Sequence, residues 1–277
     1  MKLILPYQSL LRSSLLAVLS AAALLTAGQT QAGTPSGKAP EPIVEPEAPF
    51  ITGSLSLMVD THFVSYGQDV WAAGQSWQDP LFHPSIELNF NLGGGFSFIL
   101  GSWWDVNDNA VSDIGNRIQE VDVWAGISYA AGDWKFTLLY QDWMYSESTE
   151  QIVDFKISYT HFLNPYFLIH SRPDGGEFLE SVGFDDGIVA QVGIAPGCSM
   201  GPVSLSFPVA VSYDTKNFHG GQAGLGFASA GVTASIPLTK AITASIGATY
   251  YYTNDLVIPG NPDEGFVMGS AGITVVF

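Results

Sequence analysis

Short runs in which apolar and polar residues alternate at every second position recur along the chain. The segments 85–91 (SIELNFN) and 153–159 (VDFKISY) are examples. A repeat of two is the side-chain period of a β-strand, because successive side chains point to opposite faces of the sheet. The pattern predicts twelve strands, at 54–63, 85–91, 96–105, 119–129, 134–143, 153–159, 166–170, 188–194, 203–213, 223–236, 242–252 and 265–277.

The connections between these predicted strands alternate in length. Short connections are expected at 92–95, 130–133, 162–165, 196–202 and 237–241, and long ones at 64–82, 106–118, 172–186 and 253–264. Intermediate connections are expected near Tyr145 and Lys216. An even number of strands places both chain ends on the same side of a closed sheet, and tight turns at one end with longer loops at the other are typical of outer-membrane barrels.

The strand count is least certain between residues 222 and 237. Ala223, Leu225 and Phe227 share one parity, whereas Ala230 and Val232 continue the apolar face in the other parity. Such a slip indicates either a β-bulge or a turn inside the segment.

A secreted β-sandwich also alternates, so two further details decide between a sandwich and a membrane barrel. Aromatic residues stand at or near the ends of the predicted strands, where an interfacial girdle requires them. The polar faces carry Asp, Glu, Asn, Ser and Thr, as a water-lined interior would. We therefore predict an all-β fold, a transmembrane antiparallel up-and-down β-barrel of about twelve strands over residues 51–277, in contact with the lipid of a bacterial outer membrane.

The chain ends on an aromatic residue within the last predicted strand. A last strand that pairs with the first would close the sheet and leave no unpaired edge in lipid. Gly272, Val275 and Phe277 are similar to the C-terminal signature by which the barrel assembly machinery recognises outer-membrane barrels, with Val275 in place of its penultimate aromatic residue. These three residues are the predicted assembly signal.

The first 32 residues are predicted to be an export signal. Lys2 and Arg12 precede or flank an apolar stretch at 13–28, and the small-residue sequence TQA ends at Ala32. The alternative, a membrane anchor, is disfavoured because the apolar run is interrupted by Ser20 and is shorter than the roughly 20 residues that cross a bilayer. Residues 33–50 are rich in Pro and Glu and predict an extended or disordered periplasmic segment.

The charge balance excludes one class of partner. Removal of the leader, which holds two basic and no acidic residues, leaves 7 Lys and Arg against 26 Asp and Glu, a formal charge of −19. Nucleic acid is therefore excluded as a partner. Cys198 is the single cysteine, so no internal disulfide forms, and nothing around it indicates catalysis.

Strand parity turns one set of charged residues toward the interior of the predicted barrel. These pore-lining candidates are Asp60, His62, Glu87, Glu120, Asp122, Lys135, Asp154 and Lys156. Acidic groups outnumber basic ones, which favours small cations or polar solutes over anions in a passive, porin-like channel. The alternative is an interior filled by side chains that pair with one another and conduct little.

The sequence also bears on functions other than a channel. The acidic run at 105–109 lacks the Gly and the distal Glu of a calcium loop, so no metal and no cofactor are expected. A hydrolase of the outer-membrane kind needs a nucleophile with partners on a suitable face, and none is found, so we predict no enzyme activity. A non-conducting structural or adhesive barrel that binds through external loops, such as the aromatic 70–82 segment, stays open as an alternative.

Several short motifs lie between residues 53 and 159. They are VDTHFVSYGQ at 59–68, HPSIELNFN at 83–91, GSWWDVN at 101–107 and EVDVWAGISY at 120–129, followed by WKFTLLYQDWMY and VDFKISY. These motifs resemble those of the TorF-type porins of Gram-negative outer membranes. The sequence departs from the family pattern at VSYG, where an Arg-Gly is common. The resemblance implies a small outer-membrane channel of undefined substrate.

Overall fold

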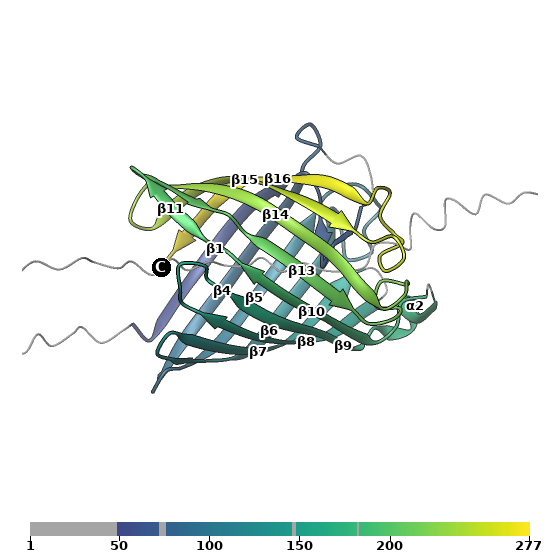
Figure 1. Ribbon diagram of the computed structural model, residues 1–277, viewed down its shortest axis with the longest axis horizontal. Coiled ribbons are helices and arrows are strands. Elements are labelled where there is room, and N and C mark those ends of the chain that lie inside the picture. The colour runs from purple at the N-terminus through teal and green to yellow at the C-terminus, as the bar shows by residue number, and fades with distance from the viewer. Residues whose placement is uncertain (1–48, 72–75, 146–147, 182) are drawn as a thin grey trace, which may run out of the picture.

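The computed structural model describes residues 49–71, 76–145, 148–181 and 183–277 (Figure 1). The predicted export signal at 1–32, and the segment at 33–50 except its last two residues, lie outside these described residues. Within the described ranges, no helix is long and apolar enough to cross a membrane.

The described chain folds almost entirely into antiparallel strands. The wall strands are β1 (Ile51–Asp60), β4 (Leu81–Gly93), β5 (Phe96–Val106), β6 (Ile118–Ala131), β7 (Trp134–Tyr145), β8 (Ser148–Tyr159), β9 (Tyr166–Asp174), β10 (Gly187–Ile194), β13 (Val209–Asp214), β14 (Gly224–Pro237), β15 (Ile242–Thr253) and β16 (Gly265–Val276). The remaining elements are β2 (Val64–Ser65), β3 (Gln68–Asp69), β11 (Gly197–Met200), β12 (Val203–Ser206) and a short helix, α2 (Gly176–Ser181).

The wall strands form a closed barrel. Each pairs with the next along the chain, and β16 pairs back with β1, for example Leu57 with Ile273. β11 and β12 prolong β10 and β13 as a hairpin, and β12 pairs with β14. The expected closed barrel of twelve strands is confirmed, and all backbone edges in the wall are paired, as a lipid environment requires.

The last residue takes part in the closure. Phe277 accepts a hydrogen bond from the backbone N–H of Gly53 at 2.8 Å and donates its own to the Gly53 carbonyl at 3.0 Å. Its ring is exposed on the outside of the barrel. The chain thus ends on an aromatic residue that the first strand holds in place.

Deletion of Phe277 is expected to lower the amount of folded barrel in the outer membrane strongly. The expected loss in the free energy of unfolding is small by comparison and does not explain such a decrease. Loss of the two hydrogen bonds to Gly53 costs about 2 kcal/mol, whereas loss of a recognition residue acts during assembly. The membrane fraction of the deletion variant should be compared with that of Phe277→Tyr, which keeps the ring and the backbone contacts. Equal levels of the two variants would remove Phe277 from the assembly signal.

The predicted irregularity in residues 222–237 is a β-bulge. The register between β13 and β14 pairs Val211 with Ala228 but Tyr213 with Leu225, so two residues of β14 oppose one of β13. Leu225 is exposed on the outer surface and Phe227 is buried inside, so these two residues do not share a face as their parity suggested. The bulge lets the apolar outer face continue from Ala228 onward.

Some boundaries differ from those expected. β1 ends at Asp60, so His62 and Phe63 lie in the connection after it and not in a strand. The predicted strand 203–213 is interrupted at Phe207 and Pro208, because proline has no N–H for the sheet. β7 and β8 approach to within a two-residue connection where a longer one was expected.

The two faces of the wall differ in chemistry. Large apolar side chains are exposed on the outside of many strands, including Phe98, Leu100, Ile127, Leu138 and Ile246. A soluble protein does not leave such a continuous apolar band in water, and a closed barrel with this exterior spans a membrane. The fold places the protein in a bacterial outer membrane.

The two ends of the barrel differ as well. We call the end that carries both termini of the barrel and the tight turns the turn end, and the opposite end, with α2 and the longer connections, the loop end (Figure 1). The connections at the loop end include 61–80, 107–117, 175–186, 215–223 and 254–264. In outer-membrane barrels the longer loops face the outside of the cell.

Candidate functional site

The interior of the barrel changes character along its axis. Toward the turn end the inward residues are mostly small and polar, and most are partly accessible, for example Ser54, Ser97, Thr233 and Ser245. Toward the loop end they are charged or aromatic and buried. The interior is therefore lined by small polar side chains near the turn end and packed near the loop end, and the packed half is the candidate functional site.

A small hairpin fills part of the packed half. β2 and β3 pair Val64 with Asp69 and Ser65 with Gln68, and these side chains are almost entirely buried except that of Val64. The turn residues Tyr66 and Gly67 have φ angles of 42° and 91°. Two successive positive φ values are typical of a tight hairpin turn.

Gly67 is required at its position for two reasons. Its positive φ is strained for residues with a side chain, and a Cβ there would lie 2.7 Å from Phe227 of β14. The turn is thus pressed against the barrel wall. We call residues 64–69 the plug hairpin.

Ring stacking holds the tip of the plug hairpin. The Tyr66 ring stacks on the His170 ring of β9 with 3.9 Å between centroids and 26° between planes, and Trp143 of β7 stacks on His170 at 5.1 Å. His170 Nδ1 lies 2.6 Å from Asp154 Oδ1. Burial, followed by the nearby Asp154 carboxylate, raises the pKa of Tyr66 well above its ordinary value, so its phenol is neutral at pH 7.

A second loop holds the plug hairpin at its turn and at β3. Asn261, in the connection between β15 and β16, accepts the backbone N–H of Asp69 at 2.8 Å and donates to the Gly67 carbonyl at 2.8 Å. Asp69 Oδ2 also lies 3.0 Å from His62 Nδ1. Asn261 therefore links the plug hairpin, which follows β1, to the loop that precedes β16, and it holds the hairpin at the turn and at β3.

Histidine links two carboxylates on the adjacent strands. His83 of β4 lies 2.7 Å from Asp60 of β1 and 3.2 Å from Asp105 of β5. Trp71 donates its indole N–H to Asp105 at 2.9 Å. This group joins three neighbouring strands to the loop that carries the plug hairpin.

Glu120 and Asp122 form the least compensated part of the interior. They lie two positions apart on β6 and on the same face, and each is 1% exposed. Three of their four carboxylate oxygens have no hydrogen-bond partner among the described residues. Buried carboxylates without partners are costly, so this pair requires a proton or a cation.

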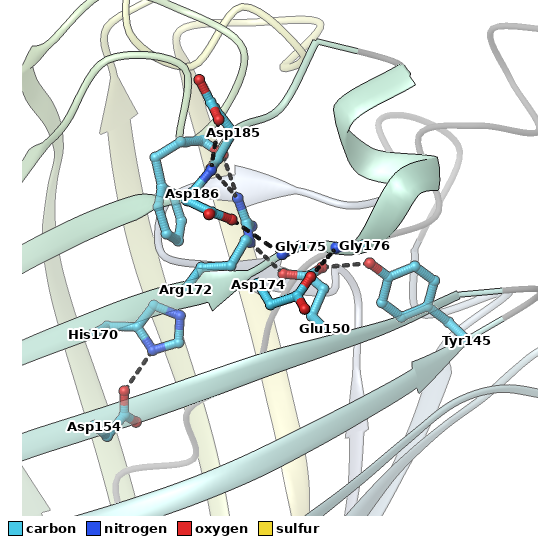
Figure 2. A network of polar contacts seen from close by, with 11 residues as sticks. Tyr145, Glu150, Asp154, His170, Arg172, Asp174, Gly175, Gly176, Asp185 and Asp186 are labelled. Atoms are coloured by element: carbon cyan, nitrogen blue, oxygen red, sulfur yellow. Dashed lines mark hydrogen bonds and ion pairs between the residues drawn. The ribbon is translucent and has the colours of Figure 1, made fainter.

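A buried ion pair lies between β8 and β9. Arg172 of β9 donates through Nε to Glu150 of β8, and Tyr145 of β7 donates to the same carboxylate at 2.6 Å (Figure 2). Both side chains of the ion pair are 0% exposed. Arg172 also donates to the carbonyl of Phe218 at 2.9 Å and lies over the Phe218 ring. The loop 215–223 is thus fastened to the barrel interior.

His219 is buried in the same loop. Its Nδ1 lies 3.0 Å from Asp214 at the end of β13, and Ser212 donates to the other oxygen of that carboxylate at 2.8 Å. Burial lowers the pKa of His219 below its ordinary value, although the hydrogen bond to Asp214 acts in the opposite direction. The loop is therefore packed around a neutral imidazole at pH 7.

The two lysines lie away from this packed half. Lys156 of β8 has its amine 4.8 Å from the centroid of the Tyr166 ring, and Lys135 of β7 is exposed near the turn end. Glu87 of β4 lies between the two halves and accepts hydrogen bonds from Asn89 at 3.1 Å and Trp124 at 3.3 Å. No ion pair joins either lysine to a carboxylate among the salt bridges of the described residues.

The structure gathers some of the eight candidates and separates others. Asp60, Glu120, Asp122 and Asp154 lie in the packed half, whereas Lys135 and Lys156 lie toward the turn end. His62 lies in a loop and not on a strand face. Residues that the sequence did not single out are equally central, and they are Tyr66, His83, Asp105, Trp143, Glu150, His170 and Arg172. Extending the strand parity through 148–152 and 171–174 would have found Glu150 and Arg172.

The known proteins that resemble this chain are found among solved structures. No protein-family model matches the chain, and no curated protein matches it. Similar solved structures include the KdgM porin, with 9% identity, a TM-score of 0.46 and coverage of 81% of this chain and 99% of that one. They also include the NanC porin (10% identity, TM-score 0.46, 80% and 98% coverage) and the outer membrane phospholipase A from Escherichia coli (14%, 0.41, 86% and 93%).

Proposed function

We propose that the protein is a porin-like outer-membrane channel through which small polar or cationic solutes diffuse, and that the plug hairpin narrows it at the loop end. The observation that carries the proposal is the run of polar inward residues that leads from the turn end to the uncompensated pair Glu120 and Asp122. Carboxylates at a constriction attract cations and repel anions. The motifs in residues 53–159 support a relationship to the TorF-type porins.

A second function is favoured by a specific observation. Trp143, Tyr145 and Arg172 are fully or almost fully buried inside the loop end, together with the plug hairpin. An interior packed in this way suits a non-conducting barrel that is structural or that binds through its loops. A hydrolase is less favoured, because none of the five histidines lies on the outward face of a described strand.

Conductance decides between the two functions. The mature chain, refolded and inserted into a planar bilayer under a salt gradient, should show discrete openings with a reversal potential directed by cations. A barrel that inserts, is fully β by circular dichroism and shifts its migration on heating, yet stays silent at all voltages, would support the structural function instead.

Replacement of both constriction carboxylates should weaken the cation preference. Glu120→Gln together with Asp122→Asn is expected to lower the ratio of cation to anion permeability by about twofold or more, because an amide cannot balance a cation as a carboxylate does. The matched control is Glu177→Gln with Glu180→Gln, which replaces two carboxylates by amides at exposed positions of α2. An equal shift of reversal potential in both double variants would show that Glu120 and Asp122 do not determine the cation selectivity.

A further inference from the structure

A groove lies on the outer surface of the barrel, on the side away from the packed interior. It has a volume of about 610 Å³, and its floor is formed by outward positions of β14, β15 and β16. The floor residues include Ala234, Ala248 and Gly269. Small side chains at these positions leave a hollow in a wall that is otherwise covered by large apolar residues.

A tryptophan from the first long connection forms one side of the groove. Ser76 and Asp79 bracket a turn in which the Asp79 N–H donates to the Ser76 carbonyl at 3.0 Å, and Trp77 lies within this turn. The turn projects from the barrel near the β16 label in Figure 1. A Cβ on Gly269 would lie 2.7 Å from the Trp77 ring, so glycine permits the ring to lie flat on β16.

The groove has one polar end. Ser76 lines it at this end beside Thr61 and His62, whereas Val232, Ile246 and Val267 line the rest. Those three apolar side chains are exposed parts of the lipid-facing band. The Thr61 hydroxyl accepts the Gly269 N–H at 2.8 Å and His62 Nδ1 lies 3.0 Å from Asp69, so Ser76 is the polar group that this end presents to the groove. Trp77 itself is 53% exposed, as an aromatic residue at a membrane interface would be.

We propose that this groove binds one acyl chain of a lipid from the bilayer leaflet at the loop end, with the lipid's polar part beside Ser76. The groove is continuous with the lipid-facing surface of the barrel, so the bilayer supplies its occupant. An apolar groove that ends at the partly exposed Ser76 matches the two parts of a lipid. The proposal depends on the membrane position of the barrel and not on conduction.

Native mass spectrometry of the full barrel, released from dioleoylphosphatidylcholine nanodiscs, tests the proposal. The unchanged protein should retain a bound lipid after bulk lipid is stripped. Ala248→Leu places a larger side chain in the groove and is expected to lower lipid retention by about tenfold, because a few methylenes lose their contact. Trp77→Ala, which removes one side of the groove from outside the barrel wall, should lower retention as well.

The matched control is Ala190→Leu, the same change at an outward position of β10 in another sector of the barrel. It should retain lipid as the unchanged protein does. Lack of a retained lipid on the unchanged protein, or equal retention by all four proteins, would overturn the proposal. If Ala248→Leu does not fold, retention by Trp77→Ala decides the outcome.

Discussion

Deletion of residues 64–69 is expected to raise the single-channel conductance by about fivefold or more, because the plug hairpin occupies the packed half of the lumen. The deletion is geometrically simple. The N–H of Val70 donates to the Phe63 carbonyl at 2.8 Å, so the two ends of the hairpin already lie side by side and two glycines can join them. Conductance in planar bilayers at fixed salt measures the effect.

Single substitutions at Tyr66 keep the plug hairpin and test only the ring stacking that holds it in the lumen. Tyr66→Ala removes the ring that stacks on His170. This variant should show a conductance between those of the unchanged protein and the deletion variant, or more frequent openings. Tyr66→Phe keeps the stack and should behave as the unchanged protein, since the Tyr66 hydroxyl has no hydrogen-bond partner among the described residues. A deletion variant that inserts and shifts on heating but conducts no better would show that the packed wall, and not the hairpin, closes the lumen.

The alternation of residues along the strands was enough to predict the barrel and the direction of many side chains. Glu120 and Asp122 were expected inside, and both are buried there beside other interior groups. Parity works in these strands because a one-residue slip would expose carboxylates to lipid, so the register is strongly fixed. The bulge in β14 was visible for the same reason, as a change of parity.

The plug hairpin could not be predicted in this way. Its sequence, VSYGQD, lies in a connection where no periodicity constrains the backbone, and its partners His170 and Asn261 lie on distant parts of the chain. The sequence placed His62 on a strand that ends two residues earlier. The conformation of a loop that folds into the lumen depends on contacts with residues far away in the sequence. A local pattern of apolar and polar residues does not contain this information.

The lysines illustrate a second limit. Strand parity put Lys135 and Lys156 on the same interior surface as the carboxylates, and pairing between them was an open alternative. The structure separates the two lysines from the buried carboxylates along the barrel axis, and Lys156 instead lies against the Tyr166 ring. Parity gives the face of a residue but not its height, because height depends on the tilt and stagger of the strands.

Arg172→Met is expected to lower the free energy of unfolding by about 3 to 5 kcal/mol. The change leaves the Glu150 carboxylate buried with Tyr145 as its remaining hydrogen-bond donor, and it removes the donor to the Phe218 carbonyl (Figure 2). Urea unfolding of the barrel in lipid vesicles, followed by tryptophan fluorescence, measures the difference.

An exposed ion pair in the same chain supplies the control. Arg117 lies 3.0 Å from Asp108, and the two side chains are 63% and 57% exposed. Arg117→Met should cost less than about 1 kcal/mol, because water screens the pair. The double variant Glu150→Met with Arg172→Met should be more stable than Arg172→Met alone, since no unpaired carboxylate is left inside. Similar losses for Arg172→Met and Arg117→Met would mean that water reaches Glu150, and the loop end would then be open enough to conduct.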